Sequence, residues 1–344
     1  FFYPMIRQPV YLFALSLFLL LSSPLTQSLS MATPSSVKSS VSSYYTALES
    51  TSSLKTNACT SQSAPPDHIK ECIKNVKQSV LEKYYGCGLC VPDLLDGCTV
   101  VDLGCGSGRD AYIISQMCGA RGKVYGVDMT DKQLEVAREA LEHHSRVEGS
   151  SVVEFHKGYI ESFADDLGLS GSVDVVVSNC VINLSPDKEA VLRQAHKCLK
   201  EGGELYFSDV YASRRVPQEL RDDEVLWGEC ISGALYWNDF LNLAKKCGFE
   251  DPRLVEDGKI KLGNKKLEEK CEGIDFYSAT YRLVKLAGLE PDCEDYGQAV
   301  IYKGSIPTAP KAFVLDSHHV IEKGKVFPVC GNSMKMLKET RFRD

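Results

Sequence analysis

The feature that most constrains the fold of this chain is a regular alternation of short apolar runs and amphipathic segments between residues 100 and 209. Strand-like runs cover residues 100–103, 124–128, 152–156, 173–177 and 204–209, and helical patterns cover residues 110–118, 131–144 and 187–199. This rhythm is typical of parallel strands joined by crossover helices. The sequence therefore predicts an α/β fold with a doubly wound, parallel-type sheet.

The flanking segments divide the chain into three predicted parts. Residues 1–42 are expected to be a disordered leader, because an apolar run at residues 10–21 follows Arg7 and a Ser/Thr-rich stretch comes after it. This leader is either a cleaved targeting segment or upstream sequence, since Met31 has the context of a natural start. Residues 43–250 form the predicted main domain, which opens with an amphipathic helix at 68–85. Residues 251–344 form a predicted smaller C-terminal α+β domain.

Composition limits the kinds of partner. The formal net charge is −7 and the chain has no long run of Lys or Arg, which argues against nucleic acid because phosphate binding needs a positive surface. We therefore expect a small-molecule substrate. The 14 cysteines are scattered rather than spaced as the framework of a short secreted domain. Most are predicted to be free thiols that pack as small apolar side chains.

A glycine-rich loop marks the predicted nucleotide site. Residues 102–108 (DLGCGSG) follow a strand and open a helix, a context in which glycine lets a nucleotide approach the backbone closely. Asp128 ends the next strand, where a carboxylate can accept hydrogen bonds from both hydroxyls of a ribose. The loop and the acidic residue together are a far more specific signal than the loop alone.

Two cofactors compete for such a loop. Nicotinamide dinucleotides prefer the spacing G-x-G-x-x-G, in which a pyrophosphate meets the helix N-terminus. Here Gly104, Gly106 and Gly108 give G-x-G-x-G, and Asp102 just before them would repel a pyrophosphate. The same carboxylate suits the cationic amino group of S-adenosylmethionine. The loop resembles motif I of class I methyltransferases, which implies a Rossmann-like fold.

Three cysteines are candidates for substrate chemistry. Cys180 follows the strand at 173–177, which places it at the carboxyl edge of the sheet, where open α/β folds bind ligands. Cys230 lies after the fifth strand and could fold over the same edge. Cys59 belongs to the N-terminal segment and would need a loop to reach that edge. Composition alone would leave each of them a small buried residue.

The sequence resembles the arsenite methyltransferases from about Tyr44 nearly to its C-terminus. The matching stretches are residues 54–59, 84–89, 102–110, 127–130, 158–161, 176–184, 202–211 and 226–237. The resemblance implies that Cys59, Cys180 and Cys230 are the ligands of trivalent arsenic. It also implies methyl transfer from S-adenosylmethionine to arsenite, which gives methylated arsenicals and serves arsenic detoxification.

The implied ligand set suits this chemistry. Trivalent arsenic is soft, thiolates are soft ligands, and three of them leave a lone pair that can attack a sulfonium methyl in line. The protein then contributes positioning, and no general base is needed. A thiol has a pKa of about 8.5, so arsenic coordination must drive its deprotonation at neutral pH.

The resemblance implies nine contacts to the cofactor. The methionyl part is expected to contact Asp102, Gly104, Gly106 and Asn179. The ribose and adenine are expected to contact Asp128, Met129, Ile160 and Glu161, with Tyr84 closing over the cofactor. The family also implies a thiol reductant such as glutathione or thioredoxin. We expect a cytoplasmic monomer, without a nucleic-acid partner and without a membrane partner for the mature body.

Two other functions stay open at this point. The first is a class I methyltransferase that acts on a carbon, oxygen or nitrogen acceptor, with incidental cysteines. The second is a thiol-based metalloid-binding or zinc-binding protein without catalysis, which would leave the glycine loop unexplained. Cys87 and Cys90 have C-x-x-C spacing, but zinc sites usually need a second ligand pair and none stands at a convincing distance. Incubation with arsenite and labelled cofactor, compared with Cys180→Ser and Cys230→Ser, would separate the first function from arsenic methylation. Thiol-dependent binding without dependence on Asp102 or Asp128 would indicate the second.

Overall fold

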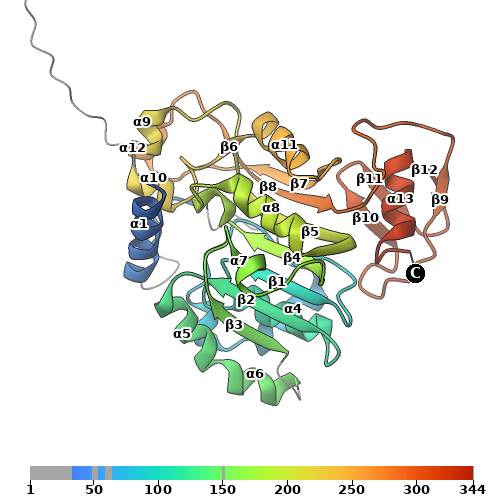
Figure 1. Ribbon diagram of the computed structural model, residues 1–344, viewed down its shortest axis with the longest axis horizontal. Helices are drawn as coiled ribbons and strands as arrows, with labels where there is room; N and C mark the ends of the chain where they lie inside the picture. The colour runs from blue at the N-terminus through green and yellow to red at the C-terminus, as the bar shows by residue number, and fades with distance from the viewer. Residues whose placement is uncertain (1–32, 49–52, 59–63, 149–151, 344) are drawn as a thin grey trace, which may run out of the picture. The chain divides into compact units, whose positions relative to one another are not determined.

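The computed structural model describes residues 33–48, 53–58, 64–148 and 152–343. Its centre is an eight-stranded sheet with the order β3-β2-β1-β4-β5-β8-β7, in which β6 pairs with β5 (Figure 1). The strands are β1 (Thr99–Leu103), β2 (Lys123–Asp128), β3 (Val153–Lys157), β4 (Val173–Asn179), β5 (Leu199–Ala212), β6 (Leu235–Tyr236), β7 (Arg253–Lys259) and β8 (Phe276–Val284). Strands β1 to β6 pair in parallel, which confirms the predicted parallel-type core.

Helices cover both faces of this sheet, as a doubly wound fold requires. Successive strand residues point to opposite faces, so Val100 and Val101 of β1 belong to two different apolar clusters. One cluster includes residues of α2 (Asp67–Asn75), α3 (Gln78–Leu81), α4 (Arg109–Cys118) and α5 (Asp131–Glu139). The other includes residues of α7 (Phe163–Asp166), α8 (Lys188–Cys198) and α11 (Trp237–Lys246). The predicted fold class is confirmed.

Two predicted helices are each divided in the structure. The segment 68–85 forms α2 and α3, because Val76 has an extended backbone (φ −74°, ψ 132°) that ends α2. The β-branched side chain of Val76 is buried in the apolar cluster beneath the helices. The segment 131–144 forms α5 and then α6 (Leu141–Glu148). The predicted strands and the remaining predicted helices are confirmed to within a few residues, except that β5 is longer at both ends.

The sheet continues past the predicted boundary between residues 250 and 251. Strand β8 pairs antiparallel with β5 from Glu204 opposite Val284 to Ala212 opposite Phe276, and β7 pairs with β8. A helix α12 (Lys265–Lys270) connects β7 to β8. Residues 253–284 are therefore an extension of the main sheet, and the expected boundary falls inside that sheet.

The smaller C-terminal part follows β8. It contains the hairpin of β10 (Ala312–Asp316) and β11 (His319–Glu322), the pair of β9 (Ala299–Ile301) and β12 (Val326–Pro328), and α13 (Gly331–Glu339). A buried ion cluster attaches it to the sheet: Glu204 of β5 pairs with Arg282 of β8 at 2.9 Å and with Arg341. Burial alone would raise the pKa of Glu204, but the two guanidinium groups hold that pKa below its usual value.

The expected disordered leader is wrong for residues 34–47, which form helix α1 (Pro34–Ala47). Thr33 caps this helix by accepting a hydrogen bond from Ser36 N at 3.2 Å, and Pro34 occupies its first turn. Tertiary contacts hold it: the Tyr44 hydroxyl donates to Glu229 Oε1 at 2.6 Å, beside α10 (Glu224–Gly228). The signal-like run at residues 10–21 lies outside the described residues. Within the described part of the chain, no helix is long and apolar enough to cross a membrane.

Candidate active site

The glycine-rich loop turns sharply between β1 and α4. Gly104, Gly106 and Gly108 have φ values of +67°, +52° and +89°, a region that favours glycine over residues with a Cβ. A Cβ on Gly104 would also lie 2.2 Å from Cγ2 of Val181. At Gly106 a Cβ would meet no atom within 4 Å, so this part of the loop faces open space. The backbone of the loop is therefore accessible to a ligand.

That open space belongs to a pocket whose empty volume, open solvent included, is about 930 Å³. All nine residues that the sequence predicts as cofactor contacts line it: Tyr84, Asp102, Gly104, Gly106, Asp128, Met129, Ile160, Glu161 and Asn179. Cys180 lines the same cavity. The structure thus brings the predicted cofactor residues and one predicted arsenic ligand together, while their individual roles stay predictions.

Asp128 is fixed at the end of β2. Its Oδ2 accepts a hydrogen bond from Gly106 N at 3.0 Å, and its Oδ1 accepts one from Thr130 N at 2.8 Å. Burial raises the pKa of Asp128, although these backbone hydrogen bonds partly offset that effect. The carboxylate therefore joins the glycine loop to the end of the neighbouring strand and borders the cavity where a ribose is expected.

The surroundings of the Asp102 carboxylate indicate which kind of ligand the cavity suits. Its Oδ2 is buried and has no hydrogen-bond partner among the described residues, although the side chain lines the cavity. Burial, together with the nearby Asp110 and Asp128, raises the pKa of Asp102 well above its usual range. A buried acceptor without a partner is costly, and a cation in the cavity would relieve that cost. The residues present therefore fit the positively charged methionyl end of S-adenosylmethionine.

Asn179 connects the cavity wall to the loop that carries Tyr84 and Cys87. Its side-chain amide donates to the Tyr84 hydroxyl at 2.6 Å and to Asp110 Oδ2 at 3.0 Å. Its carbonyl oxygen accepts from Cys87 N at 3.0 Å. The guanidinium of Arg109 lies 3.8 Å from the centre of the Tyr84 ring. Sequence analysis did not identify Arg109 or Asp110 as site residues, because neither has a distinctive position in the glycine motif.

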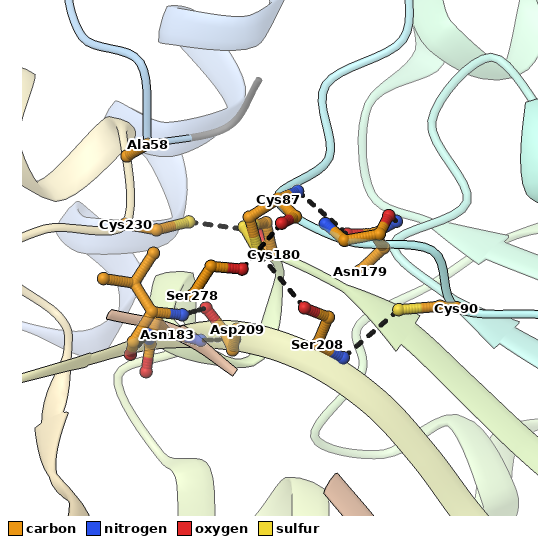
Figure 2. The surroundings of a disulfide bond; sticks show 12 residues. Ala58, Cys87, Cys90, Asn179, Cys180, Asn183, Ser208, Asp209, Cys230 and Ser278 are labelled. Atoms are coloured by element: carbon orange, nitrogen blue, oxygen red, sulfur yellow. Dashed lines mark hydrogen bonds between the residues drawn. A yellow bond between two sulfur atoms is a disulfide. The ribbon is translucent and has the colours of Figure 1, made fainter. Parts of the chain in front are cut away.

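Two of the three predicted arsenic ligands converge. The sulfur atoms of Cys180 and Cys230 and a carboxylate oxygen of Asp209 all lie within 4.8 Å of one another, and all three residues are buried. Cys180 follows β4 and Cys230 follows α10, and the Cys230 thiol donates to the carbonyl oxygen of Cys180 at 3.0 Å (Figure 2). Cys180 and Cys230 have φ values of +55° and +64°, and such backbone strain is frequent at functional sites.

The third predicted ligand, Cys59, lies outside the described residues. Ala58, the residue before it, is fully buried in the same apolar cluster as Cys180 and Cys230, and Figure 2 shows it beside this group. The segment that leads to Ala58 is anchored by a hydrogen bond of 3.0 Å from Asn57 N to the Leu262 carbonyl oxygen. The structure thus places the N-terminal segment beside Cys180 and Cys230 as far as Ala58.

The expectation of a free thiol at Cys180 is wrong for this state of the protein, because Cys180 forms a disulfide with Cys87 (Figure 2). The Cα atoms of the two residues are 5.8 Å apart. Asn179 places Cys87 there through its hydrogen bond to the backbone, and the Ser278 hydroxyl donates to the Cys87 carbonyl oxygen at 2.6 Å. Cys230 takes no part in the disulfide.

Sequence analysis missed Cys87, although its C-x-x-C spacing with Cys90 was a signal of thiol chemistry. Cys90 instead packs beneath the site, where its sulfur accepts from Ser208 N at 3.2 Å and its thiol donates to the Ser178 carbonyl oxygen at 3.1 Å. Burial raises the pKa of Cys90 well above its usual range. Cys90 is therefore a buried thiol that packs beneath the site.

Asp209 was also missed. Burial raises its pKa to about 6, while hydrogen bonds from Val210 N and Asn183 N act in the opposite direction. Those bonds measure 2.8 Å and 2.9 Å and orient the carboxylate toward the two sulfur atoms. An acidic residue inside an apolar strand, as in residues 205–212, was the available signal.

Comparisons with known proteins agree with this geometry. Residues 94–248 match the family described as "Methyltransferase domain", and residues 296–344 match the "Arsenite methyltransferase C-terminal domain". The arsenite methyltransferase of Aquipseudomonas alcaligenes is 60% identical over 88% of this chain and 88% of its own length. The arsenite methyltransferase of Homo sapiens is 44% identical over 89% of this chain and 82% of its own length.

A solved structure extends the agreement to three dimensions. The crystal structure of an arsenic(III) S-adenosylmethionine methyltransferase from Chlamydomonas reinhardtii superimposes with a TM-score of 0.78 and 46% sequence identity. The similarity covers 81% of this chain and 94% of that chain. Together with the converging cysteines and the glycine-loop cavity, these matches show that the chain belongs to the arsenite methyltransferase family.

Proposed function

We propose that this chain transfers a methyl group from S-adenosylmethionine to trivalent arsenic held by Cys59, Cys180 and Cys230. The observation that carries the proposal is the convergence of two of these cysteines beside the cavity of the glycine loop. The identity to arsenite methyltransferases over 88% of the chain supports the same substrate. Methylation of arsenite would serve arsenic detoxification.

The cofactor part of the cavity binds and orients S-adenosylmethionine. S-adenosylmethionine supplies its methyl group from a sulfonium centre. Asp102 offers a buried carboxylate oxygen without a partner to the positive charge of the methionyl end. Asp128 accepts from the ribose hydroxyls while its bonds to Gly106 and Thr130 keep it in place. Tyr84, joined to Asn179 at 2.6 Å, closes the wall of the cavity next to Cys180.

The sulfur part of the cavity holds the acceptor. Thiolates of Cys180 and Cys230 bind arsenic, and Cys59 arrives from the N-terminal segment as the third sulfur ligand. Three sulfur ligands leave one lone pair on arsenic, so the direction of that lone pair is set by the protein. Attack on a methyl group moves no proton, so this step needs no general base. Cys180 and Cys230 are buried, which limits the access of water to the acceptor.

Arsenic binding requires that the disulfide between Cys87 and Cys180 be opened first. Two electrons and two protons from an external dithiol or from two monothiols convert this disulfide into two thiols, and the reductant becomes a disulfide. Thioredoxin and glutathione are reductants of this class. A reducing compartment such as the cytoplasm suits an enzyme with this requirement.

The direct test is incubation of the reduced protein with arsenite and S-adenosylmethionine labelled in its methyl group. We expect labelled methylated arsenicals from the wild type and from Cys247→Ser, a control at a buried cysteine at the end of α11. Cys180→Ser and Cys230→Ser should give none. If all four proteins bind the cofactor and none methylates arsenic, the chain is a methyltransferase for another acceptor. If arsenic binds with no effect of Asp102→Asn or Asp128→Ala and no product forms, it is a metalloid-binding protein.

A further inference from the structure

A second thiol site lies in the C-terminal part, outside the described lining of the active-site cavity. Cys330 caps the N-terminus of α13, and its sulfur accepts a hydrogen bond from Ser333 N at 3.4 Å. Arg253 of β7 approaches the same sulfur with Nη2 at 3.6 Å. A helix N-terminus and a guanidinium both stabilise a thiolate. Together with Ser333, they lower the pKa of Cys330 to about 7 against the effect of its burial.

A chain of hydrogen bonds connects the Cys330 sulfur to the imidazole of His319 and the carboxylate of Asp316. The Cys330 sulfur lies 3.3 Å from the Ser333 hydroxyl, which lies 3.2 Å from Nε2 of His319. Nδ1 of His319 lies 2.7 Å from Oδ1 of Asp316. Asp316 thus orients the imidazole, and the Ser333 hydroxyl can pass a proton between His319 and the sulfur. Packing alone would not need such an arrangement around a buried cysteine.

A second cysteine stands beside the first. The backbone hydrogen bond from Gly331 N to the Glu294 carbonyl oxygen, at 2.8 Å, holds the segment of Cys293 against the start of α13. The Cys293 side chain is exposed, whereas Cys330 is only 6% exposed. The interaction between the two thiols raises the pKa of Cys293 and contributes to the lowered pKa of Cys330. One thiol therefore meets solvent, and its partner is poised as a thiolate directly behind it.

The charged residues around Cys293 and Cys330 determine which reagents can approach these thiols. Asp292, Glu294 and Asp295 are exposed on either side of Cys293. Behind it, Arg253 is paired with Asp251 at 2.6 Å and with Asp316, so it adds little net positive charge. An anionic reagent is repelled by this acidic segment, while neutral and cationic reagents are not.

We propose that Cys293 and Cys330 form a redox-active dithiol that exchanges with neutral or cationic low-molecular-weight disulfides. The proposal does not depend on the arsenic chemistry of the active site. It assigns a task to each member of the cluster: Cys293 meets the disulfide, Cys330 resolves the intermediate, and Ser333, His319 and Asp316 are positioning residues that carry the proton.

The exchange balances in two steps. Cys293 transfers its proton to the Cys330 thiolate, and its sulfur attacks a disulfide RSSR, so that a Cys293–S–S–R bond forms and RS⁻ leaves. Cys330 then loses that proton through Ser333 to His319, and its thiolate attacks the Cys293 sulfur. A Cys293–Cys330 disulfide forms, and the second RS⁻ leaves and takes the proton. The dithiol is oxidised by two electrons, and one disulfide is reduced to two thiols.

The test treats the reduced full-length protein with cystamine, a dicationic disulfide, and stops the reaction with acid and N-ethylmaleimide. Mass spectrometry of a tryptic digest should find residues 286–303 joined to residues 326–335 by a disulfide. In Cys330→Ser, a cysteamine adduct on Cys293 should persist at least about tenfold longer than in the wild type, because no thiolate resolves it. Glutathione disulfide, which is anionic, should react about tenfold more slowly than cystamine at low ionic strength, and added salt should reduce this difference.

Variants at Cys271, His319 and Ser333 serve as controls for the proposed exchange. Cys271, at the C-terminal end of α12, has a pKa raised by burial, so Cys271→Ser should behave as the wild type. His319→Gln and Ser333→Ala should form the same cross-link about threefold to tenfold more slowly at pH 7, with the rate profile shifted to higher pH. Retained affinity for S-adenosylmethionine shows that each variant is folded. The proposal is overturned if the wild-type adduct persists as long as that of Cys330→Ser. It is equally overturned if no cross-link forms, or if Cys293→Ser leaves the reaction at Cys330 unchanged.

Discussion

The active-site cavity has two halves that differ in how the chain builds them. The cofactor half is centred on one continuous strand, loop and helix, with Asp128 added by the neighbouring strand. Residues from other segments complete its lining: Tyr84, Ile160, Glu161 and Asn179. The sulfur half is assembled from Cys87, Cys180 and Cys230, which lie in three segments far apart in the sequence. The cofactor half offers backbone groups and carboxylates that need no activation. Under the proposed function the sulfur half needs reduction before it can act, since Cys180, one of the proposed ligands, is in a disulfide.

This difference predicts that the two halves fail independently. Cofactor binding should survive damage to the sulfur half, and arsenic binding should survive damage to the cofactor half, while methyl transfer needs both. The four expected outcomes below test this separation, from the largest effect to the smallest.

Loss of Cys180 or Cys230, the two proposed arsenic ligands that the structure describes, should have the largest effect. In Cys180→Ser or Cys230→Ser, a hydroxyl replaces a soft ligand, so arsenic keeps only two sulfur ligands and is no longer directed toward the methyl group. We expect the rate of arsenite methylation to fall at least about 1000-fold, because positioning of the acceptor is lost. The Kd for S-adenosylmethionine, measured by calorimetry, should change less than about twofold. A parallel loss of cofactor affinity would contradict the separation of the two halves.

Removal of Cys87 should relieve the need for reduction. The Cys87→Ser variant cannot form the disulfide with Cys180, so the oxidised protein keeps both described ligands as thiols. We expect the affinity of the oxidised variant for arsenite to exceed that of the oxidised wild type by at least about 100-fold. The two reduced proteins should bind arsenite equally well. A variant that still requires a reductant, for example through a new bond between Cys180 and Cys230, would contradict this account.

Removal of the Asp128 carboxylate should damage only the cofactor half. Asp128→Ala loses the acceptor expected for the ribose and the two bonds that join Gly106 and Thr130. A charged hydrogen bond contributes about 1.5 to 3 kcal/mol, so the Kd for S-adenosylmethionine should rise roughly 10- to 150-fold. Asp165→Ala, at an exposed aspartate on α7, serves as the control. Unchanged arsenite binding by the reduced Asp128→Ala protein is the second expected result.

The pH dependence of cofactor binding should report on Asp102. Only the ionised carboxylate attracts a cation, so affinity is complete at high pH and is lost as falling pH protonates Asp102. Because burial raises the pKa of Asp102 well above 3.8, this loss begins at a higher pH than for an exposed aspartate. Between pH 8 and pH 5 we expect about a tenfold weakening. Asp102→Asn should bind more weakly at pH 8 and show a flat profile, and an equally steep profile in this variant would assign the titration to another group.

The sequence predicted which residues would come together in the cofactor half, because its constraints are local. Residues 102–108 must follow a strand and open a helix, and the positive φ values of Gly104 and Gly106 require glycine in the loop itself. Strand alternation placed Asp128 and Asn179 at the same edge, and the structure lines the cavity with both. Each of these predictions depended on neighbours within about one strand and helix.

The misses share a dependence on distant contacts. The pairing of Cys87 with Cys180 depends on Asn179, which lies 92 residues from Cys87 in the sequence. Helix α1 is held by the contact of Tyr44 with Glu229, 185 residues away, so its Ser-rich sequence looked like a loose leader. Strands β7 and β8 extend the sheet in antiparallel register, and no local pattern distinguishes such an extension from a new domain. The thiol state of a cysteine and the edge of a sheet are properties of the whole fold.

Arsenic X-ray absorption spectroscopy of the reduced protein with one equivalent of arsenite tests the central claim most directly. The account predicts three sulfur neighbours around arsenic, and two in each of the Cys59→Ser, Cys180→Ser and Cys230→Ser proteins. The same spectrum for Cys247→Ser should match the wild type. Oxygen-only coordination in the wild type, or three sulfur neighbours that persist in Cys180→Ser and Cys230→Ser, would contradict it.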